Sequence, residues 1–205
     1  MKPVRGAVPP LATLQARKQN FVRDAIWDAA IDLLAEKGFD ETTVDDIALA
    51  AGVSRRSFFR YFSSKNDLMA HGIVSYGTSL TDAIQACPPT DSPAEVFEAT
   101  VRRVTENGAA HPRTRKIMEI AAKYPGAREA QLFRIIEVQD QVAEAFSLRF
   151  SAGARDDLAA QLFAGLTLAA IGATFRAWFE NGPQDISSTV ARVFDTLGQF
   201  IGDGA

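Results

Sequence analysis

The amino-acid sequence predicts an all-α protein of about nine helices, in which a small N-terminal three-helix bundle with a helix-turn-helix precedes a larger helical domain. Apolar residues recur at helical spacing in one segment after another, and Gly and Pro fall between these segments. No run of alternating β-branched residues predicts a strand. The chain of 205 residues has room for both parts, which we place at 16–65 and 66–205, after an arm over 1–15.

The first predicted helix spans about 16–37 and ends at Gly38. The chain up to this helix and into its first two turns is basic, so the arm over 1–15 could follow a DNA backbone or minor groove. A tail that its charge keeps soluble explains Lys2 and Arg5 equally well. The apolar face of the helix comprises Val22, Ile26, Ala29, Ala30, Leu33 and Leu34.

The stretch over 43–65, TVDDIALAAGVSRRSFFRYFSSK, has the pattern of a helix-turn-helix. Thr43 supplies an N-cap hydroxyl for a short helix, and Gly52 ends that helix with a residue that tolerates positive φ. Ser54 then supplies the N-cap of a second helix. The first turn of this second helix projects Arg55, Arg56 and Ser57, at the positions that enter a major groove.

The second helix is strongly basic, because no acidic residue lies between Val53 and Lys65. A surface that faces phosphates needs this sign. Arginine pairs with guanine, serine contacts base edges or phosphates, and an aromatic ring can touch a thymine methyl group. The alternative is a solvated basic helix in an ordinary bundle, which the Gly-Val-Ser turn directly before the basic run makes the weaker interpretation.

The segment ALAAGVSRRSFFRYFSSKNDL, residues 48–68, resembles the recognition segment of the TetR family of bacterial transcriptional regulators. The resemblance is specific for about the first third of the chain and concerns only helix order beyond it. Phe59 departs from the tyrosine common at its position, which removes a phosphate-binding hydroxyl. The DNA-binding residues that the resemblance implies are Thr43, Ser54, Arg55, Arg56, Ser57, Phe59, Arg60, Tyr61 and Lys65.

Helical patterns continue through the rest of the chain. A capping box over 92–95, with Pro93 at the first helical position, opens one of these helices, and Gly182 closes another. The predicted spans are about 65–88, 93–108, 114–124, 127–150, 156–180 and 186–201.

Residues 158–175 carry no charge, which reaches the lower length limit for a membrane span. Their many Ala and Gly residues favour a buried interface helix instead, with no membrane partner. The last two helices of two chains would form a four-helix interface, although periodicity allows both to serve only the core of one chain. The family resemblance favours the homodimer. The candidate interface residues are Leu162, Gly165, Ala169, Ala173, Val190, Phe194, Leu197 and Ile201.

The resemblance also implies a binding site for a small-molecule effector within residues 66–205. The residues that could line this site are apolar, which predicts an apolar or aromatic effector. Apolar residues at helical spacing usually belong to the core, and most candidates should do so. The segment over 110–132 also resembles regulators of acyl-CoA type, in which Arg113, Arg115 and Lys116 could contact phosphates, or simply be solvated. The candidate lining residues are Phe97, Val101, Met118, Tyr124, Phe133, Ile136, Phe146, Phe163, Leu166, Phe175 and Trp178.

No catalytic motif is present, and His71, His111 and Cys87 make a weak case for a metal or nucleophilic site. We therefore expect no catalytic residue, no metal, no cofactor and no enzymatic activity. A single cysteine and an N-terminus without a signal-peptide pattern indicate a cytoplasmic protein. Residues 1–66 carry ten Lys and Arg against eight Asp and Glu, whereas the remainder is acidic.

Together these features predict a ligand-responsive repressor that binds a palindromic operator as a homodimer. An effector would move the fourth helix and change the spacing of the two recognition helices. A ligand-independent DNA-binding regulator or architectural protein is the alternative, and it is distinguished by whether any small molecule weakens DNA binding. The sequence does not specify the operator, the regulated genes, the effector, or whether the protein represses or activates transcription.

Overall fold

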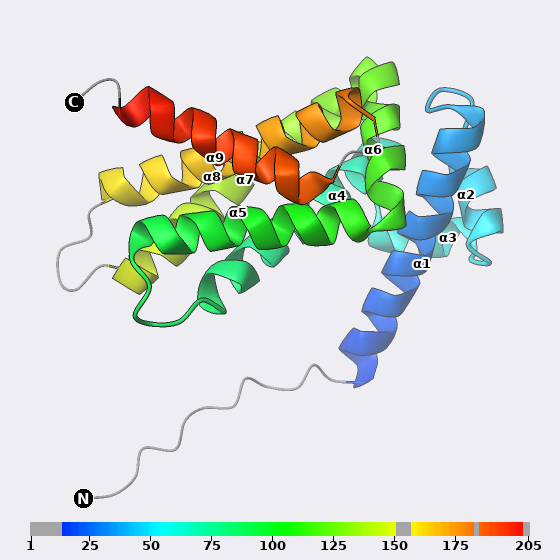
Figure 1. The fold of residues 1–205 in the computed structure, drawn as a ribbon. Helices are drawn as coiled ribbons and strands as arrows, with labels where there is room; N and C mark the ends of the chain where they lie inside the picture. The colour runs from blue at the N-terminus through cyan, green and yellow to red at the C-terminus, as the bar shows by residue number, and fades with distance from the viewer. Residues whose placement is uncertain (1–13, 151–156, 183–184, 203–205) are drawn as a thin grey trace, which may run out of the picture. The chain divides into compact units, whose positions relative to one another are not determined.

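The computed structural model describes residues 14–150, 157–182 and 185–202, and over these it contains nine α-helices and no strand (Figure 1). The predicted all-α class is therefore confirmed. The chain divides into two compact units, unit 1 over residues 1–63 and unit 2 over residues 64–205. Lys65 thus belongs to unit 2, and the basic arm over 1–15, with Lys2 and Arg5, lies outside the described residues except for its last two.

Unit 1 contains three helices, in which α2 packs against both α1 and α3. The helix α1 begins two residues before its predicted start, and its buried residues include Ile31 in addition to part of the predicted face. The three helices are α1 (Leu14–Lys37), α2 (Val44–Ala50) and α3 (Arg55–Tyr61). The buried apolar residues are Ile26, Ala30, Ile31, Leu34, Phe39, Ile47, Ala48, Phe58 and Phe62.

The loop from α1 to α2 is fixed by two neighbouring features. Gly38 adopts φ +99°, which ends α1 in the left-handed region that favours glycine. Thr42 is fully buried, and its hydroxyl donates to the Gly38 carbonyl oxygen at 2.7 Å. Because a buried hydroxyl without a partner would cost free energy, this bond stabilises the loop that leads into the helix-turn-helix.

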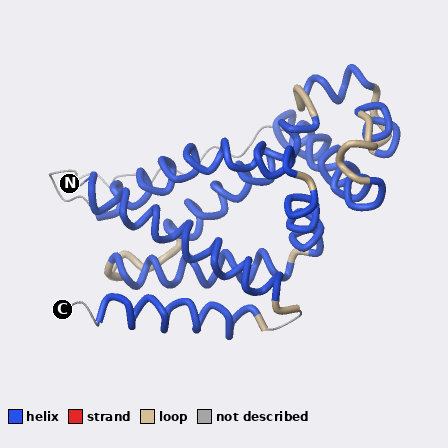
Figure 2. The backbone as a smooth tube through the Cα atoms, turned by 90° about the horizontal axis from the view of Figure 1, so that it is seen from above, coloured by secondary structure: helices blue, strands red, loops and turns tan. Residues whose placement is uncertain are grey.

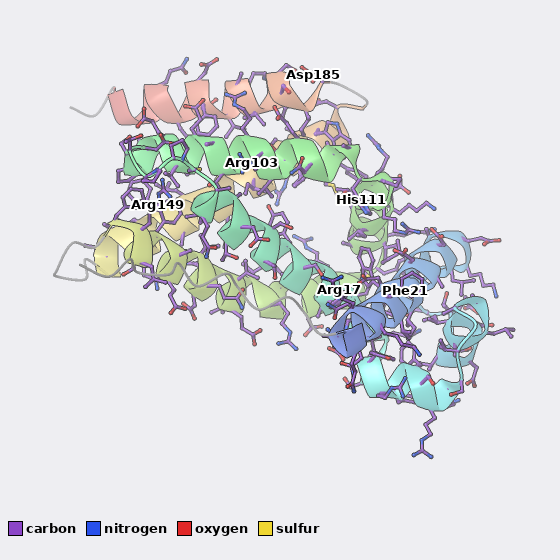
Figure 3. All side chains as sticks on the ribbon, turned by 90° about the horizontal axis from the view of Figure 1, so that it is seen from below. Arg17, Phe21, Arg103, His111, Arg149 and Asp185 are labelled. Atoms are coloured by element: carbon purple, nitrogen blue, oxygen red, sulfur yellow. The ribbon has the colours of Figure 1, made fainter. Side chains whose placement is uncertain are left out.

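Unit 2 contains six helices. The short helix α6 crosses the end of the bundle that α5, α7, α8 and α9 form (Figures 1 and 2). Its N-cap is His111, which also caps the end of α5 and lies at their junction in Figure 3. The helices are α4 (Lys65–Gln85), α5 (Pro93–Ala110), α6 (Pro112–Lys123), α7 (Pro125–Phe150), α8 (Asp157–Glu180) and α9 (Ile186–Gly202).

The core of unit 2 lies where α4 packs along α7 and where α8 packs against α5, α7 and α9. The Phe146 and Phe163 rings stack at 5.5 Å between centroids, and the Phe97 ring meets the Phe194 ring edge-on at the same distance. Gly108 has no side chain to obstruct Phe175, since a Cβ atom there would lie 2.5 Å from the ring. Part of the apolar surface of α8 is therefore used for packing inside the unit.

Two polar features lie at the edges of unit 2, and the sequence predicts the first of them. Ser92 and Glu95 form the predicted capping box at the start of α5. Arg149, labelled in Figure 3, donates from Nη1 to the Ile84 carbonyl oxygen at 3.3 Å and from Nη2 to the Pro88 carbonyl oxygen. These bonds connect the end of α7 to the loop after α4.

Candidate nucleic-acid interface

The helix α2 begins at a complete capping box. The Asp46 backbone N–H donates to Thr43 Oγ1 at 3.1 Å, and the Thr43 N–H and hydroxyl both donate to Asp46 Oδ2, at 2.9 and 2.6 Å. These bonds from Thr43, with the Lys37 ammonium 3.6 Å away, lower the pKa of the Asp46 carboxyl. The Thr43 hydroxyl is exposed at this helix start, but it is already engaged by its own capping partner.

The turn between α2 and α3 depends on Gly52, which adopts φ +65°. Its N–H donates to the Leu49 carbonyl oxygen at 3.1 Å, and the Val53 N–H donates to the Ala48 carbonyl oxygen at 2.9 Å. This pair of bonds is a Schellman motif, which satisfies carbonyl groups that the helix end leaves without partners. The turn therefore fixes the direction in which α3 leaves α2.

Ser54 caps α3 as the sequence predicts. Its Oγ accepts from the Ser57 backbone N–H at 3.1 Å, and its hydroxyl donates to Ser57 Oγ at 3.0 Å. No acidic residue lies in the first turn of α3, so the positive end of the helix dipole and the basic side chains act in the same direction. This helix start is therefore suited to a negatively charged partner.

The two sides of α3 have different roles. Phe58 is fully buried and Phe62 nearly so, and their rings lie 5.9 Å apart. Phe59 points outward with 46% of its surface exposed, and its ring meets the Phe58 ring edge-on at 5.4 Å. The buried rings anchor α3 in unit 1, and the opposite side remains open to a partner.

The outer side of α3 carries three arginines in different environments. Arg55 Nη1 donates to Asp45 Oδ2 at 2.6 Å, and its guanidinium lies 5.5 Å from the centre of the Phe59 ring. Arg60 Nη2 donates to the Tyr61 hydroxyl oxygen at 3.1 Å. Arg56 is exposed and has no hydrogen-bond or ion-pair partner among the described residues. All three guanidinium groups lie on an exposed helix, where arginine can pair with phosphates or guanine bases.

The structure brings eight of the nine predicted DNA-binding residues together at the start of α2 and along α3. The ninth, Lys65, is the first residue of α4 in unit 2, and its position relative to α3 is outside what the structure describes. Sequence reasoning missed Asp45, an exposed acidic residue in the first turn of α2. Its carboxylate is the acidic group that Arg55 contacts.

Two sequence families match this chain. Residues 26–71 match the bacterial regulatory proteins of the tetR family, and residues 88–201, more than half of the chain, match the MftR C-terminal domain. The chain belongs to the TetR family. TetR-family regulators are DNA-binding proteins rather than enzymes. Their N-terminal domain contains a helix-turn-helix, which α2 and α3 form in this chain.

Two relatives in the TetR family match over most of their length. The transcriptional regulator TcmR of Streptomyces glaucescens is 25% identical over 185 residues, which cover 85% of this chain and 80% of the relative. The mycofactocin biosynthesis regulator MftR of Mycobacterium tuberculosis is 27% identical over 186 residues, which cover 89% of this chain and 92% of the relative. Both are similar to this chain across its two units.

Solved structures show the same fold. NalD of Pseudomonas aeruginosa, the secondary repressor of the MexAB-OprM multidrug efflux pump, has a TM-score of 0.64 and 19% identity over 89% of this chain and 96% of its own. FadR of Thermus thermophilus, a TetR-family repressor solved with lauroyl-CoA, has a TM-score of 0.53 and 24% identity over 85% of this chain and 92% of its own. At these identities the likeness concerns the fold.

The predicted effector-lining residues of this TetR-family chain fall into three groups. Val101 and Phe146 are fully buried in the core of unit 2, where Phe97, Phe163 and Phe175 pack against them. Met118, Tyr124 and Trp178 are half-buried. Ile136 is 70% exposed and Leu166 is 40% exposed, so both side chains lie at the surface of the unit rather than in its core. The side chain of Phe133 lies outside the described residues.

The basic residues of α6 are not simply solvated. The Arg115 guanidinium lies 5.0 Å from the centre of the Trp178 ring and 5.5 Å from that of the Phe179 ring. These cation–π contacts connect α6 to the end of α8. Arg113 and Lys116 also make interactions within the chain.

The predicted dimer residues divide between two helices. On α9, Val190 is fully buried, and Phe194 and Leu197 pack against the core of their own unit. Val190 therefore belongs to the core of its own unit, and the Ile201 side chain lies outside the described residues. Gly165 of α8 is half-buried. Five exposed apolar residues of α8 lie along one side of the helix and form the α8 surface: Leu158, Leu162, Leu166, Ala169 and Ala173.

Proposed function

We propose that the chain is a ligand-responsive TetR-type repressor that binds a pseudopalindromic operator as a homodimer and releases it when a small effector binds to unit 2. The observation that carries this proposal is α3, which presents Arg55, Arg56 and Arg60 on an exposed face with no acidic residue in the helix. NalD and FadR, which share the fold, are both described as repressors.

In this proposal, phosphate contacts hold the protein on DNA, and α3 reads the sequence. Thr43, Tyr61 and Lys65 contact phosphates. Ser54 lies at the start of α3, where backbone N–H groups also favour phosphate. The residues that read base edges are Arg55, Arg56, Ser57, Phe59 and Arg60.

The homodimer forms through the α8 surface. Leu158 is 71% exposed and Leu162 is 58% exposed, an unusual degree for two leucines one turn apart on a long helix. The apolar side of α9 already serves the core of its own unit, so α9 contributes its polar side to the rim of the interface. A homodimer carries two α3 helices, one for each half of a twofold operator.

The effector is an apolar, aromatic or acyl-type molecule that binds within unit 2. Support comes from the aromatic core there and from FadR of Thermus thermophilus, which was solved with lauroyl-CoA. A repressor of this kind works in the cytoplasm, where its operator lies. A ligand-independent regulator is the alternative, and it predicts that no small molecule weakens DNA binding.

The experiment that tests this function is a selection of binding sites from random DNA with the full-length protein, followed by a salt series on the selected site. We expect a site of twofold symmetry with half-sites about one helical turn apart. We also expect the logarithm of the binding constant to fall steeply with the logarithm of the salt concentration. Selection of no common sequence would contradict the proposed function.

A further inference from the structure

Two buried hydroxyl groups in unit 2 have no hydrogen-bond partner among the described residues. The Thr100 hydroxyl lies on α5 and the Tyr76 hydroxyl on α4, a helix that packs against α5. Thr100 is fully buried, and the Tyr76 hydroxyl oxygen is shielded from solvent at the end of a half-buried ring. An unsatisfied buried hydroxyl costs about 1–3 kcal/mol, so native proteins seldom retain one without a reason.

Other buried threonines in the same unit satisfy their hydroxyl groups by hydrogen bonds to the helix backbone, which Thr100 does not. Thr105, Thr167 and Thr174 are also fully buried, and each hydroxyl donates to the backbone carbonyl oxygen four residues earlier, at 2.7 to 2.8 Å. The Thr100 hydroxyl makes no such bond, although it lies inside the same kind of helix. Figure 3 labels Arg103, which lies three residues further along α5.

Tyr76 remains a neutral donor in this environment. Its ring packs against the apolar core of unit 2, and burial raises the pKa of its hydroxyl well above the usual range. Each hydroxyl group can therefore donate a hydrogen bond to an acceptor that comes within its reach.

The surroundings also restrict the charge of such an acceptor. Among the described residues of unit 2, the fully buried polar side chains are threonines, and charged side chains are at most partly buried, with the Nε atoms of Arg113 and Arg149 shielded from solvent. A carboxylate or phosphate beside the buried threonines would lose its hydration with no fully buried charged residue to compensate, which is unfavourable. A carbonyl oxygen has a much smaller desolvation cost and can accept two hydrogen bonds.

We infer that Tyr76 and Thr100 are the hydrogen-bond anchors of the effector site, and that the effector carries a neutral acceptor, such as a ketone, ester or thioester carbonyl, on an apolar body. This inference rests on the proposed ligand-responsive function and specifies the chemistry of its ligand. Neither residue is suggested by the sequence pattern, because a tyrosine and a threonine on helical faces are ordinary core residues.

The first test uses the free protein and requires no ligand. Thr100→Val and Tyr76→Phe remove the hydroxyl groups and keep the shape of each side chain. We expect the thermal unfolding midpoint to stay unchanged or rise, because no hydrogen bond is lost. Thr105→Val is the matched control, and it should lower the midpoint because its hydroxyl is bonded to the Val101 carbonyl oxygen. Midpoints that fall for Thr100→Val and Tyr76→Phe as they do for Thr105→Val would overturn the inference.

The second test compares ketones with hydrocarbons of the same shape. The probes are 2-acetylnaphthalene against 2-isopropenylnaphthalene and 2-undecanone against 2-methyl-1-undecene, titrated by intrinsic fluorescence. At least one ketone should bind the wild type roughly tenfold more tightly than its hydrocarbon, as two net hydrogen bonds imply. This preference should vanish in the Tyr76→Phe, Thr100→Val double variant.

DNA binding of the double variant, measured in the same samples without probe, separates the two proposals. Because neither residue lies in unit 1, operator affinity should match that of the wild type. Intact operator binding without any ketone preference, or a preference that survives in the double variant, would overturn the inference and leave the repressor function in place. A wild-type protein that does not bind the operator would instead contradict the proposed function.

Discussion

The guanidinium of Arg55 donates to the carboxylate of Asp45 at 2.6 Å, which links the first turn of the recognition helix to the first turn of the helix before it. Both side chains are 62% exposed, so the pair contributes about 1 kcal/mol or less to stability. The same carboxylate competes with DNA for the guanidinium. In the free protein, Arg55 is therefore partly neutralised, whereas Arg56 beside it has no such partner among the described residues.

We predict that Asp45→Asn strengthens operator binding about two- to fivefold, because DNA no longer has to displace the carboxylate. Asp40→Asn is the matched control, since it changes the net charge equally at an exposed residue whose carboxylate has no partner among those described. Fluorescence anisotropy at one salt concentration measures both. Equal affinities for the two variants would show that Asp45 acts only through general charge, and weaker binding by Asp45→Asn would show that it positions Arg55 for DNA.

The turn before the recognition helix should be sensitive to the backbone of one glycine. Gly52→Ala places a side chain at φ +65°, where a Cβ atom meets no neighbour but the backbone itself is strained, and it should cost about 1–2 kcal/mol. Gly198→Ala is the matched control in open space inside α9, and it should stabilise by about 0.5–1 kcal/mol. Urea unfolding measures both changes. The same sign for both variants would refute the role given to the Gly52 backbone.

The capping box at α2 predicts a pH dependence. The hydrogen bonds from Thr43 lower the pKa of Asp46 below its ordinary value of 3.8, so the folded state favours the charged form. Its contribution is present above that value and is lost as the pH falls through the lowered pKa. Asp46→Asn should therefore lower the thermal unfolding midpoint at pH 7. The difference in midpoint between the variant and the wild type should disappear near pH 2. A difference in midpoint that is the same at both pH values would exclude stabilisation by the charged Asp46 carboxylate.

The α8 surface predicts the oligomeric state. Leu162→Glu should convert the protein to a monomer, because burying a carboxylate in an apolar interface without a partner is strongly unfavourable. Leu148→Glu, at a leucine of α7 that is 72% exposed and outside the α8 surface, should leave the dimer intact. Analytical ultracentrifugation gives the mass of both. A wild type that is monomeric at micromolar concentration would contradict the proposed dimer directly.

Much of the fold follows from local sequence. The caps Thr43, Ser54 and Ser92 fix where three helices begin, because each side chain meets a nearby backbone N–H. Gly52 similarly fixes the turn, since few other residues adopt its φ. These contacts lie within a few residues of one another, so the sequence pattern contains them.

The remaining features depend on which helices meet. Periodicity identifies the apolar face of α9, but it does not state whether Val190 faces its own core or a second chain. The contact of Arg55 with Asp45 requires the angle between α2 and α3, and the unpartnered Thr100 hydroxyl requires a side-chain orientation. Such relationships arise from tertiary packing, which no local pattern specifies.

The central claim is that the exposed arginines of α3 bind DNA specifically, and one comparison tests it most directly. The affinity of the Arg55→Ala, Arg56→Ala double variant for the selected operator is measured beside the wild type and an Arg102→Ala, Arg103→Ala variant, which removes the same charge from α5. We predict a loss of about a hundredfold or more for the α3 variant and less than about threefold for the α5 variant. Equal affinity of all three proteins for the operator would contradict the assignment of α3 as the recognition helix.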